Sequence, residues 1–397
     1  MKSNRLKSLV AIFTLLNSIL FSQDAMITQI AGKNMTTFSV KNQSFEGKGW
    51  DTIVSKVQKS DFVLIGEDHF INEIPFFFSA LTNKVKFDNF FCEIDTYSAK
   101  IIESKIKNLS DTQLRNYVAD FGNVFSFYAF DPEFELLKQL VNSKTSIYGT
   151  DQILLVADRL VCSELKLKTK NAKAKKIYEN IENKSKSYFA EFLKDQNKPF
   201  FMKTVEFESE IKKLLVLNLS QEEKEKAEAL QFTAKIYNDE DSHHLRIQLM
   251  KSNLMKVYSE WKDKKNLFKF GANHLAKGES LLKIYDIGNL VNNVADSKFK
   301  NSLHIMILGK SGTQASPFQG FPDEIVDENS GSFKLLKPFF DHVTSNEWSC
   351  FDMLPLRMAL ENGKLIVKDV KLARIIKGYD YLVIIPKVTA SKFPKTK

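Results

Sequence analysis

One short segment constrains the fold of this chain more than any other: Phe62–His69, with the sequence FVLIGEDH. Its first four residues are apolar, which predicts a strand buried on both faces of a sheet. The glycine that follows lets the backbone turn where a side chain would clash. If the chain stays extended, Glu67 and His69 project to one side and Asp68 to the other. We therefore expect a carboxylate and an imidazole together at a strand end, where open α/β sheets bind ligands.

A second segment, Asn266–His274 (NLFKFGANH), has the same design. An apolar, strand-like run again meets a glycine, and a histidine follows three residues later. The chain has only 6 histidines, and two of them stand in this Gly-x-x-His context. We infer that His69 and His274 share one site. The alternative is that each histidine only caps a turn or makes a hydrogen bond within the core.

Apolar runs alternate with helical patterns along much of the chain. Helical patterns cover residues 76–85 and 98–142, where Ser110–Gln113 resembles a capping box and Asp131-Pro132 opens a helix. The alternation predicts an α/β fold with a central mixed, mostly parallel sheet flanked by helices. Further strands are expected at Asn89–Asp95, Ser146–Tyr148, His304–Gly309 and Tyr379–Pro386, and a polar loop is expected at Lys310–Gly331.

The region of about 155–260 differs from the rest, because it is rich in lysine and glutamate and contains no glycine. This composition predicts a helical insertion that leans on the sheet. Arg246, Met250 and Asn253 fall on one helical face, which suits an arginine clamp for an anionic group. His243 and His244 are interpreted as surface residues. No long linker divides the chain, so residues 24–397 are expected to form a single domain.

Residues 1–23 have the pattern of an export signal, with Lys2, Arg5 and Lys7 ahead of an apolar segment from Leu9 to Phe21. That apolar segment is shorter than the about 20 residues of a membrane span. The sequence therefore predicts cleavage near residues 22–24 and an exported protein, periplasmic or secreted, without a stable membrane span. An uncleaved amino-terminal anchor is the alternative.

Composition narrows the class of protein. The formal net charge is +9, but the lysines are scattered among acids, which argues against a nucleic-acid partner. The three cysteines allow at most one disulfide, and there is no CxxC pair to indicate structural zinc. The 33 phenylalanines favour a well-packed globular enzyme or binding protein, whose partner we expect to be a small molecule.

Two further acids are candidates for the site. Glu73 lies four residues after His69, one helical turn on, and is expected to point back toward it. Glu93 lies in the strand that closes the strand-helix-strand unit beginning at Phe62, so we place it in the site. A solvated position at the sheet edge is the alternative for Glu93.

These motifs together resemble the erythromycin esterase family and, more widely, ChaN-like haem-binding lipoproteins and Tiki/TraB proteases. The resemblance spans roughly residues 60–390. Gly-Glu-Asp-His at 66–69 has one residue fewer before its histidine than esterase members usually have, and so is closer to the ChaN and Tiki form. The matching motifs, in the same order as in the family, are Gly66–His69 with Glu73, the strand ending in Glu93, Tyr148–Asp151, Arg246 with Met250 and Asn253, Gly271–His274, and Tyr379–Leu382.

The resemblance implies one cleft lined by six residues: Glu67, His69, Glu73, Glu93, Arg246 and His274. A histidine oriented by a carboxylate takes a proton from water in general-base catalysis. Our leading hypothesis is hydrolysis of an ester or related acyl bond, with His69 as base and Glu67 or Glu93 orienting it. His274 and Arg246 would support the oxyanion. Gly-x-Ser-x-Gly is absent from the sequence, which disfavours a serine nucleophile.

Two other hypotheses use the same groups, although the leading one requires no cofactor. Glu67, His69 and His274 are a plausible donor set for a divalent metal with an open position for water, as in a metal-dependent hydrolase or protease. Alternatively, the protein binds haem or another planar ligand through histidine, with phenylalanines as an apolar wall.

Overall fold

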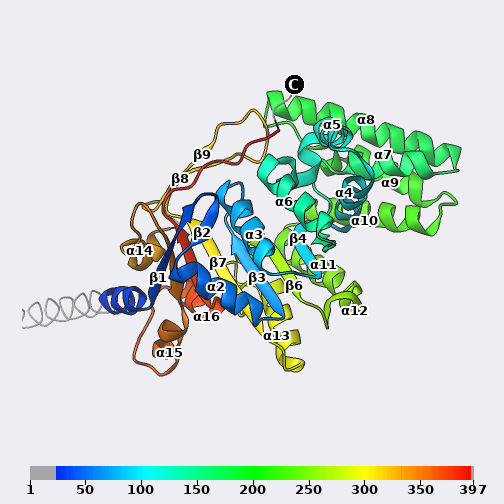
Figure 1. Cartoon of the computed structure of the whole chain (residues 1–397). Helices are drawn as coiled ribbons and strands as arrows, with labels where there is room; N and C mark the ends of the chain where they lie inside the picture. Colours follow the sequence, from blue (N-terminus) through cyan, green and yellow to red (C-terminus); the bar gives the residue numbers. More distant parts are fainter. Residues whose placement is uncertain (1–23, 332, 395–397) are drawn as a thin grey trace, which may run out of the picture.

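A nine-stranded sheet forms the centre of the molecule (Figure 1). The computed structural model describes residues 24–331 and 333–394, so the expected signal segment, residues 1–23, lies outside the described residues. The strand order is β2-β1-β10-β11-β7-β3-β6-β4-β5. The strands of this sheet are β1 (Met35–Lys41), β2 (Ser44–Glu46), β3 (Phe62–Glu67), β4 (Asn89–Asp95), β5 (Ser146–Asp151), β6 (Asn266–Gly271), β7 (Ser302–Gly309), β10 (Trp348–Asp352) and β11 (Tyr381–Ile385).

The six strands from β11 to β5 in this order are parallel, whereas β10, β1 and β2 pair antiparallel at one edge. The expectation of a mixed, mostly parallel sheet is therefore confirmed. Each apolar strand predicted from the sequence is present, with bounds shifted by a few residues. The antiparallel edge was not predicted, because β2 has only 3 residues and Trp348–Asp352 lies in an aromatic stretch without clear periodicity.

Helices cover both faces of the sheet, so successive residues of β3 enter two different cores. Val63 and Ile65 pack in one core, and Phe62 and Leu64 pack in the other. Burial on both faces explains why the run is apolar throughout. The α-helices are α2 (Lys48–Gln58), α3 (Glu73–Lys84), α4 (Thr96–Asn108), α5 (Asp111–Phe121), α6 (Asp131–Asn142), α7 (Asp158–Lys168), α8 (Ala172–Lys194), α9 (Val205–Leu215), α10 (Gln221–Asn238), α11 (Ser242–Lys256), α12 (Tyr258–Trp261), α13 (Ile287–Ser297), α14 (Lys337–Phe340), α15 (Leu354–Glu361) and α16 (Val370–Gly378).

Short 3₁₀ segments and one small hairpin complete the fold. The segment expected to be a polar loop contains a two-stranded antiparallel hairpin, which corrects that prediction. Its glycine- and proline-rich sequence gave no strand periodicity. The capping box at Ser110–Gln113 is confirmed. The remaining elements are η1 (Gly122–Ala129), η2 (Phe201–Lys203), η3 (Ala272–His274), η4 (Lys334–Leu336), β8 (Ser311–Gln314) and β9 (Glu324–Asp327).

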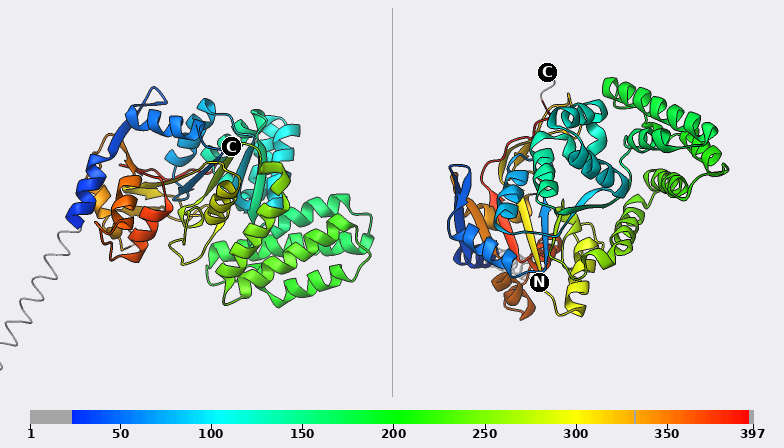
Figure 2. Two further views of the ribbon diagram at one scale, coloured as in Figure 1. Left: turned by 90° about the horizontal axis from the view of Figure 1, so that it is seen from below. Right: turned by 45° about the vertical axis from the view of Figure 1, so that its right-hand side comes forward.

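Between β5 and β6 the chain is helical, from α7 to α12. Helix α11 packs against β5, but α8, α9 and α10 stand out to one side of the sheet and pack mainly on each other and on α7 (Figure 2). The expectation that this whole insertion leans on the sheet is therefore wrong for its outer helices. They bury apolar residues such as Ile181 and Phe207 among themselves, so they need no sheet face to cover.

No helix within the described residues is long and apolar enough to cross a membrane. Cys92, Cys162 and Cys350 are all buried and free.

Candidate functional site

The two Gly-x-x-His segments lie on adjacent parallel strands. β3 and β6 pair so that Glu67 is opposite Gly271, and both strands end at the same edge of the sheet. A cleft of about 1650 Å³ opens there, and it is lined by Glu67, His69, Glu93, Arg246 and His274, among others. His69 and His274, which are 205 positions apart in the sequence, therefore line one cleft, at the sheet edge where α/β folds bind ligands.

His69 is held by a chain of charged groups that runs into the core. Its Nδ1 lies 3.0 Å from Glu67 Oε1, as expected for side chains on one side of an extended segment. Lys269 Nζ donates to Glu67 Oε1 at 2.7 Å and to Glu133 Oε1 at 2.8 Å. The ring of Phe127 stacks on the imidazole with centroids 4.3 Å apart. His69 itself keeps 25% of its side chain exposed, so it faces the cleft.

Glu93 joins the two histidines. Its Oε2 lies 3.5 Å from His69 Nε2, and its Oε1 lies 3.4 Å from His274 Nε2. The backbone N–H of Gly271 donates to Oε2 at 2.7 Å. On its other side, His274 Nδ1 lies 2.8 Å from Asp286 Oδ2. One buried carboxylate therefore fixes both imidazoles.

Arg246 reaches the site from α11. Its Nη2 donates to Glu93 Oε1 at 2.7 Å, and its Nε donates to Asp151 Oδ1 at 2.9 Å. Met250 is buried and Asn253 Nδ2 donates to the carbonyl of Thr150 at 2.9 Å, so the three residues share the face turned to β5. The guanidinium is thus committed to two carboxylates at the ends of β4 and β5.

Burial and charge act against each other on these groups. Burial alone would lower the pKa of His274, but Glu93 and Asp286 outweigh it and raise that pKa to about 10. Burial would also lower the pKa of His69. The carboxylates of Glu93 and Glu67 outweigh burial, so this pKa is raised above its usual 6.5. Burial would raise the pKa of Glu93, but the two imidazoles and Arg246 hold it well below its usual value. At neutral pH the site therefore holds a cationic His274 beside an ionised Glu93, and the pKa of His69 is raised by the same carboxylate.

Both glycines of the paired motifs allow close approach rather than an unusual turn. A Cβ on Gly66 would lie 2.8 Å from Cα of Ala272, so the second segment could not approach the first. A Cβ on Gly271 would lie 2.8 Å from His69 Nε2 and 3.5 Å from Glu93 Oε2. Tyr379, from the last motif, donates its hydroxyl hydrogen to the carbonyl of Ala272 and so holds this segment in place.

Gly271→Ala is expected to lower kcat/KM by about 10²-fold without unfolding the protein, because the new methyl group displaces His69. The backbone at Gly271 has a φ of −54°, which alanine adopts without strain. The matched control is Gly278→Ala, where a Cβ would meet nothing within 4 Å. Steady-state kinetics and thermal unfolding measure both effects. Equal activity of the two variants would show that the position of His69 does not matter.

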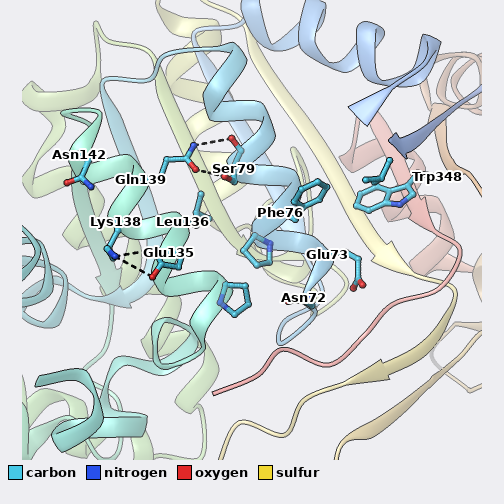
Figure 3. A pocket seen from close by; sticks show the side chains of 13 residues that line it. Asn72, Glu73, Phe76, Ser79, Glu135, Leu136, Lys138, Gln139, Asn142 and Trp348 are labelled. Atoms are coloured by element: carbon cyan, nitrogen blue, oxygen red, sulfur yellow. Dashed lines mark hydrogen bonds and ion pairs between the residues drawn. The ribbon is translucent and has the colours of Figure 1, made fainter. Parts of the chain in front are cut away.

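Glu73 does not join this cleft, which corrects the sequence-based prediction. Its carboxylate accepts hydrogen bonds from the backbone N–H of Thr389 at 2.9 Å and from the Thr389 hydroxyl at 2.7 Å. Figure 3 shows Glu73 at another pocket, with Asn72, Phe76 and Trp348. The i, i+4 argument fails because α3 begins only at Glu73, so residues 69–72 are not on that helix.

His243 is also placed differently from its prediction. His244 is exposed, as expected, but His243 lines the cleft and its ring centroid lies 6.1 Å from that of His274. Burial and the nearby cations His274 and Arg246 lower its pKa. Adjacent helical residues point about 100° apart, so one of the pair turns inward.

Sequence reasoning missed several residues of the site, chiefly Asp286, Lys269 and Glu133. Lys269 carried a readable signal, because a lysine within an apolar strand run must find a buried partner. Asp151 was noticed at a strand end but was not assigned to the site. Asp286 and Glu133 lie in a loop and at the start of a helix, where nothing in the sequence distinguishes them from surface acids.

A metal bound by Glu67, His69 and His274 does not fit this arrangement. Glu67 contacts His69 through Nδ1, whereas Nε2 of His69 and Nε2 of His274 both face Glu93, at 3.5 and 3.4 Å, so the three proposed donors do not face one point. In residues 24–331 and 333–394, no group of three or more histidine, cysteine, aspartate or glutamate side chains is arranged to hold a metal ion.

The fold and the cleft define a class of α/β protein with a histidine and carboxylate site at its parallel-strand edge. No family model and no curated protein matches the sequence. Among solved structures, a mutant of erythromycin esterase EreC in its open conformation matches with a TM-score of 0.60 and 14% identity, over 91% of this chain and 100% of that chain. The predicted resemblance to erythromycin esterases is thereby confirmed for the fold.

Two other solved structures share the fold. A succinoglycan biosynthesis protein matches with a TM-score of 0.56 and 14% identity, over 94% of this chain and 99% of that chain. A protein from Bacillus cereus matches with a TM-score of 0.53 and 14% identity, with the same coverage of 94% and 99%. Haem-bound ChaN of Campylobacter jejuni matches with a TM-score of only 0.30, which carries no argument for a haem site.

Proposed function

We propose that this protein is a hydrolase that cleaves an ester or related acyl bond with water activated by His69. The observation that carries the proposal is the partly exposed imidazole of His69 in the cleft, with Nδ1 3.0 Å from the buried carboxylate of Glu67. Such a pair is suited to general-base catalysis. The fold shared with an erythromycin esterase supports the choice of an acyl bond.

In this proposal His69 takes a proton from water as the water oxygen attacks the acyl carbon. Glu67 orients the ring through Nδ1 and stabilises the imidazolium that forms. The carbon–oxygen bond to the leaving alcohol then breaks, and His69 returns the proton to that alcohol. The products are a carboxylic acid and an alcohol, so the reaction requires no cofactor.

The developing oxyanion needs a positive group, and His274 supplies one in this proposal. Its raised pKa keeps it protonated at neutral pH. Arg246 is held by Glu93 and Asp151, so it contributes through the charge network around Glu93. We also propose that the protein is exported and acts on a small molecule, because of the amino-terminal sequence pattern and the concave site.

The pH dependence of turnover tests this function. We expect kcat/KM for 4-nitrophenyl esters of short and long acids to rise with pH through an apparent pKa above 6.5, since His69 acts as base only when neutral. It should fall again as pH approaches about 10, where His274 loses its proton. Hydrolysis in ¹⁸O-labelled water should place the label in the released acid. Turnover no faster than buffer at every pH would contradict the proposal.

A further inference from the structure

Three cationic side chains at the floor of the cleft are paired with carboxylates. Lys269 pairs with Glu67 and Glu133, and Arg246 pairs with Glu93 and Asp151. At the edge of the floor, Arg374 pairs with Glu279. Each of these three cations already faces a carboxylate, so they offer no free positive charge to a ligand, and any preference of the cleft for an anion must come from its walls.

One wall of the cleft is cationic. Lys283, Lys334, Lys368 and Lys371 all line it and are all exposed. Within the described part of the chain, no acidic side chain forms an ion pair with any of the four. Asp369 lies on the same wall, but its Oδ1 accepts the N–H groups of Lys371 and Leu372 and so caps α16.

The four lysines come from three segments that the fold places together. Helix α16, which carries Lys371, contacts η4, which carries Lys334. The loop that carries Lys283 is joined to α16 through Glu279 and Arg374. The cationic wall therefore arises from the tertiary structure, because its lysines come from three separate segments. Lysines on an ordinary solvated helix face would all come from one helix.

Aromatic and aliphatic side chains of the cleft pack against the core on one face of the sheet, whereas α16 packs in the core on the other face. The outer helices of the insertion lie away from α16 (Figure 1). Phe127 stacks on His69, and Phe318 packs against Phe192 of α8 with ring centroids 5.2 Å apart. Leu154 packs against the same core as Phe127 and Phe318. At the cationic wall, Leu282 is 45% exposed and Val370 is 60% exposed, so apolar surface continues to the rim.

From this division we infer that the substrate is an amphipathic ester with an anionic group and a sizeable apolar body. The anionic group would lie against the lysine wall and the apolar body against the aromatic side, with the ester between them at His69. The volume of about 1650 Å³ exceeds that of common small-molecule pockets, so a large substrate is accommodated. This inference rests on the proposed function, but its binding part is testable without turnover.

Two fluorescent probes that differ in one group measure the binding preference. 8-Anilinonaphthalene-1-sulfonate is anionic and aromatic, and N-phenyl-1-naphthylamine is the same framework without the sulfonate. In the Lys334→Gln/Lys371→Gln variant we expect the Kd for the sulfonate to rise roughly fivefold to thirtyfold, as for two lost exposed charge pairs, and the Kd for the neutral probe to change less than twofold. Salt at about 0.5 M should also raise the Kd of the wild type for the sulfonate, because it screens the lysine charges.

Two comparison variants complete the experiment. Lys175→Gln/Lys176→Gln removes two exposed lysines of α8 outside the cleft and should change neither Kd. Phe318→Ala should weaken both probes, because it shortens the apolar side. Equal losses for the two probes in the lysine variant, or no binding of the sulfonate to the wild type, would overturn the inference. If the wild type binds the two probes as expected but hydrolyses no ester, the proposed reaction is contradicted and the inference about binding stands.

Discussion

His69→Asn is expected to lower kcat/KM for ester hydrolysis by about 10² to 10⁴-fold, the usual contribution of a positioned general base. Asparagine fills much of the same space and can still contact Glu67, but it cannot take up a proton at any working pH. The fold should survive, because 25% of this side chain is exposed and the two rings that it contacts, Phe127 and Phe70, are themselves only partly buried.

The chain supplies a matched control in His244→Asn. His244 is exposed on α11, and its Nε2 lies 3.0 Å from Gln248 Nε2 of the same helix. Kinetics and thermal unfolding of both variants separate a catalytic role from a loss of structure. The proposed mechanism fails if the two variants keep the same activity, or if His69→Asn loses activity only in proportion to its unfolding.

Lys269→Met is expected to lower the free energy of unfolding by about 3–5 kcal/mol at neutral pH, as for other buried ion pairs that lose one partner. Lys269 is only 2% exposed, and it is the cation bonded to both Glu67 and Glu133. Methionine has a similar volume, so the change isolates the charge. Glu67 and Glu133 then remain buried without this counter-ion.

The stability lost in Lys269→Met should depend on pH in a defined direction. Burial already raises the pKa of Glu133 to about 7 although Lys269 opposes the shift, so removing Lys269 raises it further. A carboxyl group with a raised pKa in the folded state holds a proton that the unfolded chain releases, so stability falls as pH rises above the unfolded value of 4.5. Lys269→Met should therefore be less destabilising at pH 5 than at pH 8.

Urea unfolding at both pH values measures this effect, with Lys264→Met as the control for an exposed lysine. Adding Glu133→Gln to Lys269→Met should recover part of the lost stability, since it removes one of the two carboxylates that lose this cation. A pH-independent loss, or a loss no greater than that of Lys264→Met, would mean that the buried charges do not interact as described.

The strands that lead to the site could be predicted from the sequence, because a strand buried on both faces of a parallel sheet is a continuous apolar run. The runs at Phe62 and Asn266 each end in glycine and histidine, and the structure pairs them as neighbours. The alternation of side chains also placed Glu67 beside His69 correctly. Helical periodicity likewise identified the face of α11 that carries Arg246.

Predictions that depended on an exact boundary or on a distant contact failed. Glu73 was expected to turn back to His69, but Phe70 has a φ of 62° and Ile71 pairs with Ala390, so the chain leaves the site before α3 begins. His243 and His244 are adjacent in sequence, and only packing of α11 decides which of them enters the cleft.

By itself, the sequence determined the α/β class, the strands that end at the cleft and the pair of histidines, because these follow from local periodicity and from glycine at close approaches. Only the tertiary structure decided that Glu93 lies between the two imidazoles, that Asp286 and Lys269 support them, and that four lysines share one wall. These contacts are between residues that are distant in the chain. The interaction between two charges depends on their distance in space, which the sequence alone does not give.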